Sequence, residues 1–250
     1  MATCMKFCWK DEKEDFFVLS SVAEKLSRPD DAIDSIKKHI KEMTEPFSKD
    51  QRWTFYQLCK KCLGDRRRSH RDALELLLVN REDFNERKSI LKLKSSIEKE
   101  IRIICNEILS LIDVCLSKLP PNELADDRVF YLKMKADHYK YLAEISNGTS
   151  EEFEKSVGKA KELYSNAQTI ADTSLYPTSI TKIGLALNYS VFLHDMLGEK
   201  ETAIEMSRET LNVVLITCQR EKMEDVEMVL QLLNIIRENL SIWSPHMEFS

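Results

Sequence analysis

Two segments of the chain carry cationic side chains at helical spacing. In CKKCLGDRRRSHR, Lys60, Arg67 and Arg71 lie within a stripe about 40° wide if the segment is a helix. Cations stacked in this way repel one another unless an anion or an acidic neighbour compensates. The stripe therefore indicates either a solvated face, which is the commoner meaning of such a run, or a site for an anionic ligand.

The segment YLKMKADHYKYLAE repeats this geometry. Lys133 and Lys140 are seven residues apart, Asp137 lies between them, and Tyr141 follows Lys140. Asp137 can hold the two lysines in place, and the tyrosine hydroxyl adds a directional donor. Cations and a phenol together suit a phosphate dianion. Two matching stripes favour a phosphate site, although spacing alone does not show that they face each other.

Two apolar helical segments each contain an asparagine within an apolar face. Asn188 is in KIGLALNYSVFLHD, and Asn239 is in VLQLLNIIRENLSIW. Such a residue usually bonds a neighbouring helix, and the alternative is a clamp on the backbone of a bound peptide. The neighbours that would complete a peptide groove are Leu187, Val191, Asp195, Leu232, Ile235 and Ile242.

The remaining pattern is helical almost throughout. Apolar residues recur at i, i+3, i+4 and i+7, and the breaks contain Pro, Gly, Ser, Asn and Asp. We expect about eight or nine helices, two of them long, at roughly 49–81 and 87–117. Candidate N-caps are Ser48, Asp126 and either Thr149 or Ser150. Short connections favour one all-α domain of antiparallel helices.

Composition excludes several classes of protein. The 250 residues carry a formal net charge of −5, so nothing attracts nucleic acid or an anionic membrane at long range. No apolar run reaches the roughly 18 residues of a membrane span, and the N-terminus lacks the apolar core of a signal peptide. We expect a cytoplasmic protein, with the nucleus as a second compartment. Seven cysteines without framework spacing indicate reduced thiols.

Metal and catalytic motifs find little support. The pair Cys59 and Cys62 has no second CxxC, so we expect no metal and no cofactor. HExxH, GxSxG and P-loop motifs are absent. Asp30, Asp31 and Asp34 match the DDxxD pattern with which all-α prenyl-diphosphate enzymes hold magnesium, but a second acidic motif is missing. A tetratricopeptide-like scaffold for unphosphorylated peptides would show a 34-residue repeat, which is also missing.

Several long segments, in order, resemble the 14-3-3 family. They are LGDRRRSHR, EIRIICNEILSLID, RVFYLKMKADHYKYLAEI, GLALNYSVFLHDML and IIRENLSIW. The resemblance implies one domain of about nine antiparallel helices over residues 11–244, between an N-terminal extension at 1–10 and a short tail at 245–250. It implies an amphipathic groove that binds phosphoserine or phosphothreonine peptides without catalysis. It also implies a homodimer, or a heterodimer with a paralogue.

The resemblance assigns roles to the residues above. Lys60, Arg67, Lys140 and Tyr141 would bind phosphate. The other polar residues of the groove would be Arg71, Lys133, Asn188, Asp195 and Asn239, and its apolar wall Leu187, Val191, Leu232, Ile235 and Ile242. The dimer interface would contain Val22, Leu26, Arg28, Ser69, Ala73, Leu76, Leu93 and Glu100, with one ion pair between Arg28 and Glu100.

The main departure from the family pattern is Lys140, where the family has Arg. Lysine keeps the charge but lacks the planar fork that contacts phosphate through two bonds. We therefore expect phosphate binding to survive and to weaken.

Overall fold

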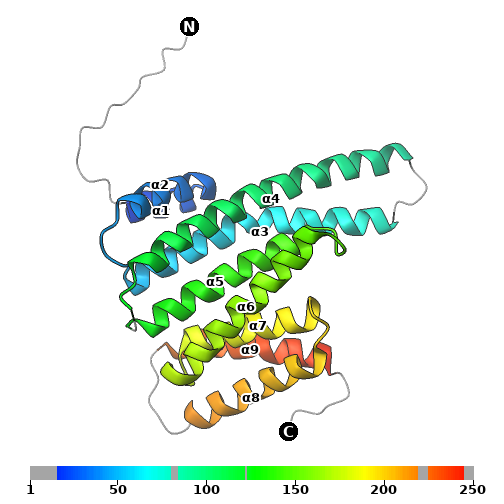
Figure 1. The fold of residues 1–250 in the computed structure, drawn as a ribbon. Helices are drawn as coiled ribbons and strands as arrows, with labels where there is room; N and C mark the ends of the chain where they lie inside the picture. Colours follow the sequence, from blue (N-terminus) through cyan, green and yellow to red (C-terminus); the bar gives the residue numbers. More distant parts are fainter. Residues whose placement is uncertain (1–15, 80–83, 122, 219–224, 245–250) are drawn as a thin grey trace, which may run out of the picture.

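A computed structural model describes residues 16–79, 84–121, 123–218 and 225–244, and within these ranges the chain forms nine α-helices and no strand (Figure 1). The helices are α1 (Phe16–Lys25), α2 (Pro29–Glu42), α3 (Lys49–Val79), α4 (Phe84–Lys118), α5 (Ala125–Glu144), α6 (Glu151–Ser174), α7 (Ile180–Asp195), α8 (Lys200–Cys218) and α9 (Val226–Trp243). The all-α prediction is confirmed, and α3 and α4 are the two long helices. The predicted extension at 1–10 and tail at 245–250 lie outside the described residues.

The helices are arranged as antiparallel neighbours in chain order (Figure 1). The short pair α1 and α2 covers one end of the long α3–α4 hairpin. Helices α5 and α6 form the middle of the molecule, and α7, α8 and α9 form the other side. The far end of the α3–α4 hairpin extends beyond the remaining helices. This order places α3, α5, α7 and α9, which carry the predicted site residues, in succession through the molecule.

Three clusters of buried apolar side chains hold the layers together. The largest joins α1, α2, α3, α4 and α5, the second joins α5, α6 and α7, and the third joins α7, α8 and α9. Cys59, Cys62, Cys105 and Cys115 are buried free thiols within the first cluster. Burial raises the pKa of the last three to about 12. Within the described part of the chain, no group of metal-ligating side chains is assembled.

The helix starts agree with the predicted caps in two cases out of three. The Ser48 and Ser150 hydroxyls accept hydrogen bonds from backbone amides three residues on, at 3.3 and 3.1 Å. Asp126 is not an N-cap, so this prediction is wrong. Helix α5 begins two residues earlier than predicted, after Leu124, whose φ of 52° places it in the left-handed region. The Asp126 carboxylate is then free to bond other helices.

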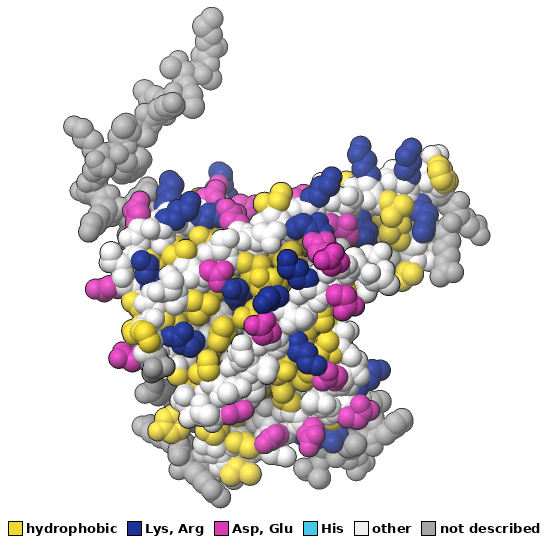
Figure 2. All heavy atoms as spheres, viewed as in Figure 1, with side chains coloured by type: hydrophobic (Ala, Val, Ile, Leu, Met, Phe, Trp, Pro, Cys, Tyr) yellow, Lys and Arg dark blue, Asp and Glu magenta, His cyan; other side chains and the backbone are white. Residues whose placement is uncertain are grey.

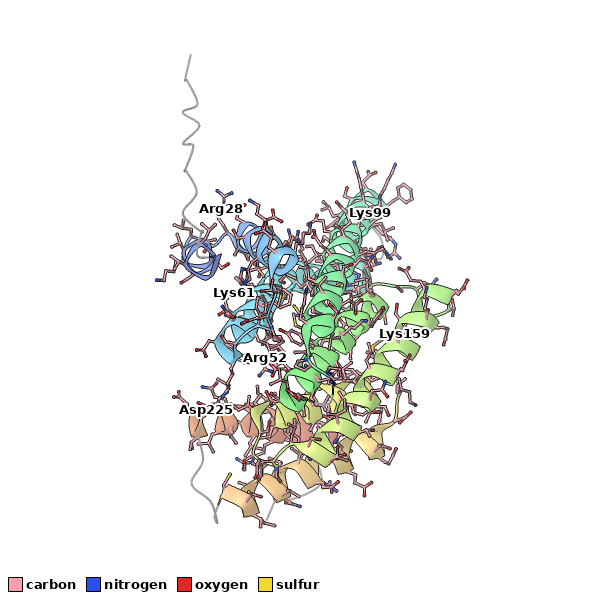
Figure 3. All side chains as sticks on the ribbon, turned by 60° about the vertical axis from the view of Figure 1, so that its left-hand side comes forward. Arg28, Arg52, Lys61, Lys99, Lys159 and Asp225 are labelled. Atoms are coloured by element: carbon pink, nitrogen blue, oxygen red, sulfur yellow. The ribbon has the colours of Figure 1, made fainter. Side chains whose placement is uncertain are left out.

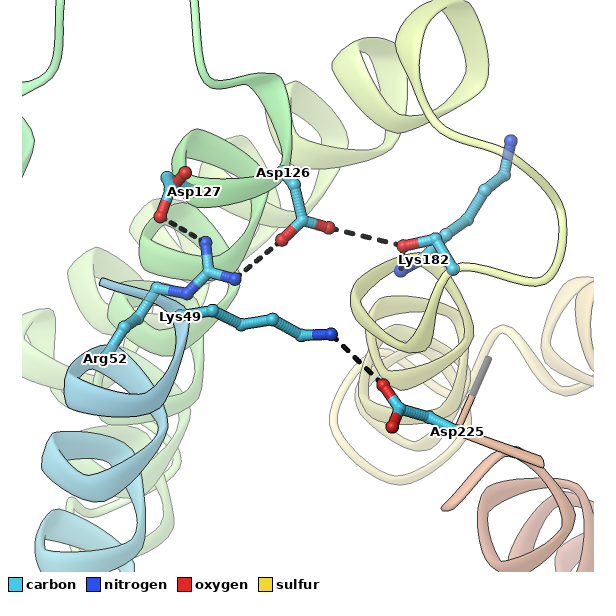
Figure 4. Close-up of polar contacts among 7 residues, drawn as sticks. Lys49, Arg52, Asp126, Asp127, Lys182 and Asp225 are labelled. Carbon is cyan, nitrogen blue, oxygen red and sulfur yellow. Dashed lines mark hydrogen bonds and ion pairs between the residues drawn. The ribbon is translucent and has the colours of Figure 1, made fainter. Parts of the chain in front are cut away.

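Arg52 is the buried cation that ties the start of α3 to α5. Its guanidinium donates to Asp126 at 2.6 Å and to Asp127, although its side chain is only 4% exposed (Figure 4). Asp126 in turn accepts from Ser179, the residue before α7. Nearby, Lys49 pairs with Asp225, the residue before α9, at 3.1 Å. Figure 3 shows Arg52 and Asp225 at this same end of the helices. These bonds fix the first turns of α3 and α5 relative to the residues that precede α7 and α9.

No helix among the described residues is long and apolar enough to cross a membrane.

His138 makes stability depend on pH. Its ring, 4% exposed, lies 2.7 Å from the Met134 carbonyl oxygen through Nδ1, and its Nε2 has no partner. Burial, only partly offset by the Met134 bond, lowers the pKa to about 4. This value includes smaller effects of Asp137, which raises the pKa, and of Lys133 and Arg67, which lower it. In the unfolded chain the His138 imidazole therefore takes up a proton near pH 6.5, whereas in the folded chain it does so only near pH 4.

We expect the free energy of unfolding to fall by about 3 kcal/mol from this residue alone between pH 7 and pH 4. Urea unfolding of the wild type and of His138→Phe at several pH values measures it. The gap between the two proteins should change with pH inside this window and stay constant above pH 7. A constant gap across the whole range would contradict the assignment.

Candidate functional site

Arg67 and Tyr141 meet at the centre of the predicted site. The guanidinium carbon of Arg67, on α3, lies 3.7 Å from the centre of the Tyr141 ring, on α5. Nε and Nη2 of Arg67 donate to both carboxylate oxygens of Glu144 at 2.8–3.0 Å. Glu144 thus contacts one edge of the guanidinium, and within the described part of the chain Nη1 has no hydrogen-bond partner. Burial alone would lower the pKa of Arg67, but Tyr141 and Glu144 outweigh it and raise that pKa.

The other predicted cations surround this centre at different depths. Lys140 is half-buried, with its Nζ 5.5 Å from the centre of the Tyr141 ring. Lys60 and Arg71 are exposed on α3, on either side of Arg67 along the helix. Burial, followed by the nearby Asp137 carboxylate, raises the pKa of Tyr141 well above its usual value, so the phenol keeps its proton. The arrangement offers charge from α3 and α5 together with one neutral O–H donor.

Asp137 is the buried carboxylate behind the site. It accepts from Lys133 at 3.0 Å and from the Tyr164 hydroxyl, and both of its oxygens accept from Nδ2 of Asn188 at 2.9 Å. Burial would raise the pKa of Asp137, but Lys133 and Lys140 outweigh it and lower that pKa. Burial would likewise lower the pKa of Lys133, but the Asp137 carboxylate outweighs burial and raises that pKa. Both side chains therefore remain charged.

The structure places Lys133 beneath the groove rather than on its surface. Its side chain is buried, and its Nζ lies 4.9 Å from the centre of the Tyr56 ring. Asn188 is half-buried on α7, and because its Nδ2 is bonded to Asp137, its Oδ1 is left to accept from a ligand. Asn188 can therefore bond Asp137 of α5 through Nδ2 and still be a candidate clamp for a peptide backbone through Oδ1.

The predicted apolar wall divides between α7 and α9. Leu187 is buried in the cluster that joins α7, α8 and α9, and Leu232 packs against it. Ile235 and Ile242 are exposed on α9, and Asn239 between them is half-buried. Five of the predicted side chains also line one depression of about 500 Å³, which we call the groove hollow. These five are Arg67, Arg71, Lys140, Val191 and Asp195.

The residues predicted at a dimer interface are mostly exposed. Val22, Leu26, Leu76 and Leu93 all present exposed apolar side chains, whereas Ala73 is already buried within the chain. Figure 2 shows apolar side chains at the far end of the α3–α4 hairpin, away from the other helices.

Within one chain, the two members of the predicted intersubunit ion pair already have partners. Glu100 accepts from Arg66 at 3.0 Å, and Arg28 pairs with Asp31. In Figure 3, Arg28 lies at the start of α2 at the surface of the molecule.

The three aspartates of the DDxxD pattern each pair with a cation. Asp30 accepts from Arg66 at 3.1–3.2 Å, Asp31 from Arg28, and Asp34 from Lys37 at 2.9 Å. Asp30 and Asp31 stand in the first turn of α2, directly after Pro29 at its start. Carboxylates there complement the positive end of the helix, so the local structure accounts for the motif.

Three residues of the site were not identified from the sequence. Glu144 orients Arg67, Tyr164 bonds Asp137, and Tyr56 packs over Lys133. Glu144 stands four residues after Lys140, one turn along α5, and this spacing could have pointed to it. Tyr164 and Tyr56 come from other helices, and no spacing in the sequence places them here.

Comparisons with known proteins point to one family. The family model described as 14-3-3 protein matches residues 19–244. The 14-3-3 protein eta of Homo sapiens is 33% identical over 239 residues, covering 93% of this chain and 94% of that protein. The 14-3-3-like protein 2 of Caenorhabditis elegans is 31% identical over 237 residues, covering 94% of this chain and 92% of that protein.

The Asp137–Lys133 pair yields a test of stability. Asp137→Asn removes the charge that compensates a buried ammonium, so we expect a loss of about 3–5 kcal/mol in the free energy of unfolding. The double variant Asp137→Asn/Lys133→Met should recover most of that loss, because no isolated charge remains buried. Urea denaturation measures both.

The exposed pair Lys159–Glu162 provides the control. Glu162→Gln breaks an ion pair of similar length, 2.8 Å, in water, and should leave the unfolding midpoint nearly unchanged. Equal losses in Asp137→Asn and Glu162→Gln would refute the special role of the buried pair.

Proposed function

Since this chain belongs to the 14-3-3 family, we propose that it is an adaptor that captures proteins phosphorylated on serine or threonine and regulates them without catalysis. The observation that carries the proposal is the meeting of Arg67, Lys140 and Tyr141 beside the half-buried Asn188. A groove with cations on one side and a backbone acceptor on the other suits a phosphorylated peptide.

The proposed contacts follow from the atoms that are left without bonds. Nη1 of Arg67 donates to the phosphate while Glu144 keeps Nε and Nη2. Lys140 and the Tyr141 hydroxyl contact the other phosphate oxygens, and Lys60 and Arg71 add charge from α3. Asn188 accepts from a backbone N–H of the peptide through Oδ1, and Asn239 does the same from α9. Arg71 and Asp195 lie farther along the groove.

The apolar wall gives the groove its second side. The uncharged side chains of the peptide face this wall, which consists of Leu187, Val191, Leu232, Ile235 and Ile242. Because the protein as a whole is acidic, the attraction for phosphate is local to the site and is not a property of the surface.

We also propose that the chain forms a homodimer, or a heterodimer with a paralogue, through α1 of one subunit and the α3–α4 hairpin of the other. Exposed Val22 and Leu26 would pack on Leu76 and Leu93, next to Ser69 and Ala73. The ion pair between Arg28 and Glu100 would form only if both release their partners within the chain. Sedimentation velocity at micromolar concentration distinguishes dimer from monomer. The compartment we propose is the cytoplasm, with access to the nucleus.

Binding of a phosphoserine peptide and of its unmodified twin tests the function. At roughly 1.5–3 kcal/mol for each hydrogen bond to a charged group, the phosphopeptide should bind at least tenfold more tightly. Fluorescence anisotropy measures both dissociation constants. Arg67→Gln should remove most of the difference, while Arg68→Gln, an exposed neighbour on the same helix, should keep it. Equal affinities for the two peptides would sink the proposal.

Lys140→Arg tests the departure from the family pattern. Arginine restores a planar fork at this position, so we expect the phosphopeptide to bind several-fold more tightly and the unmodified peptide to be unaffected. The same anisotropy assay measures the change. Lys135→Arg on the same helix, whose lysine pairs with Asp113, is the matched control. If Lys140→Arg leaves the dissociation constant where it is, the weakening we attribute to lysine is wrong.

A further inference from the structure

The connection between α5 and α6 contains a dipeptide that is chemically labile. It is formed by Asn147 and Gly148, and no other asparagine in the sequence is followed by glycine. Both residues are exposed, as is Thr149 after them. Asparagine is one of the thermally labile residues of proteins, and a following glycine, which lacks Cβ, leaves the most room for attack on the side-chain amide.

The backbone amide of Gly148 is available as the attacking group. Within the part of the chain that the structure describes, its N–H has no hydrogen-bond partner, whereas the amides of Thr149 and Ser150 donate to Oδ1 and to the carbonyl oxygen of Asn147 at 3.3 and 2.8 Å. A Cβ added to Gly148 would meet no atom within 4 Å, so the space around this amide is open. Neither a hydrogen bond nor packing among the described residues therefore restrains the Gly148 nitrogen.

Two other exposed asparagines lack this combination. Asn166 lies inside α6 and Asn212 inside α8. In a helix the following amide is bonded to a carbonyl four residues earlier, and here it belongs to a residue with a Cβ, Ala167 or Val213. Both differences protect the side-chain amide, so these two asparagines are controls within the same chain.

We propose that Asn147 is a site of spontaneous deamidation through a succinimide formed with Gly148. The Gly148 nitrogen loses its proton to solvent base and bonds to Cγ of Asn147, while the bond from Cγ to Nδ2 breaks and Nδ2 leaves as ammonia with a proton from water. Water then opens the ring at one of its two carbonyl carbons. Attack at Cγ gives aspartate, and attack at the backbone carbon gives isoaspartate, whose main chain runs through Cβ and Cγ.

The two products have different effects on the start of α6. Aspartate keeps the oxygen that accepts from Thr149 and adds a negative charge before the positive end of the helix. In isoaspartate, the carbonyl that now accepts from the amide and hydroxyl of Ser150, at 2.8 and 2.7 Å, is no longer part of the main chain. Ser150 is the N-cap of α6, since its hydroxyl accepts from the Phe153 amide. Isoaspartate therefore weakens the cap, whereas aspartate preserves it.

Incubation of the purified protein at mildly alkaline pH, followed by digestion at acidic pH and mass spectrometry, tests the site. We expect the peptide with Asn147 to exchange NH2 for OH at least about tenfold faster than the peptides with Asn166 and Asn212, which corresponds to a barrier lower by about 1.4 kcal/mol. Labelling with a protein isoaspartyl methyltransferase measures the share of isoaspartate. Equal rates at the three asparagines would overturn the proposal.

Gly148→Ala tests the attacking group. The added Cβ meets no atom within 4 Å, and the φ of Gly148 is not in the left-handed region, so the variant should fold. Its methyl group should slow the reaction at Asn147 at least about tenfold. Gly158→Ala, on the exposed side of α6, is the matched control, because its Cβ also meets no atom, and it should leave the rate unchanged. A rate that Gly148→Ala does not alter would overturn the succinimide route.

Thermal unfolding tests the effect on α6. The isoaspartate form, separated by chromatography, is compared with the unreacted wild type and with Asn147→Asp. We expect isoaspartate to lower the melting temperature by about 2–4 °C, the shift that loss of one helix cap gives in a chain of this size, and Asn147→Asp to stay near the wild-type value. Equal melting temperatures for isoaspartate and Asn147→Asp would overturn the role assigned to the Asn147 carbonyl.

Discussion

The buried ion pair between Asp137 and Lys133 is the constraint on which the site depends. Two charges that are almost completely removed from water face each other at 3.0 Å, and this pairing is the main reason that both remain charged. The same carboxylate fixes Asn188 on α7 and Tyr164 on α6, so three helices meet at one group. The orientation of Asn188 in the groove wall is therefore set by a buried carboxylate, which is only 2% exposed.

A second arrangement of this kind operates at the ends of the helices. Arg52 joins α3 to the two aspartates at the start of α5, and Asp126 extends the connection to Ser179 before α7. The two buried networks lie at opposite ends of α5, one near its start and one in its second half. Between them they fix the helix that carries Lys140 and Tyr141 relative to α3, which carries Arg67. An acidic protein can thus maintain a compact group of cations, because the charges that order it are themselves buried and paired.

The sequence predicted the helices and the residue types of the site, and it did not predict their depth. Periodicity places Lys133 and Lys140 on one stripe because seven residues are close to two turns, yet one is buried beneath Tyr56 and the other is half-exposed. Helical spacing gives the angular position of a side chain around its own helix, whereas burial depends on which side chains of neighbouring helices pack over it. Asp126 shows the same limit: a cap residue is recognised by its type, but α5 begins after the left-handed Leu124, two residues earlier than that type predicts. Glu144 could have been found from its spacing, while Tyr164 required knowledge of which helices are neighbours.

The carboxylate of Glu144 gives the site a built-in competitor. Glu144 already bonds Nε and Nη2 along one edge of the Arg67 guanidinium at 2.8–3.0 Å, so a carboxylate from a client competes with it there and is left with Nη1. A phosphate dianion has three oxygens with which to span Nη1, Lys140 and Tyr141 at once, and a carboxylate has two on one planar group. Under the proposed function, we expect an aspartate or glutamate introduced in place of a phosphorylated serine to be a poor phosphomimetic for this groove. In this proposal a carboxylate from a client competes with Glu144 for Arg67 and gains little binding free energy, because both are planar groups with a single negative charge.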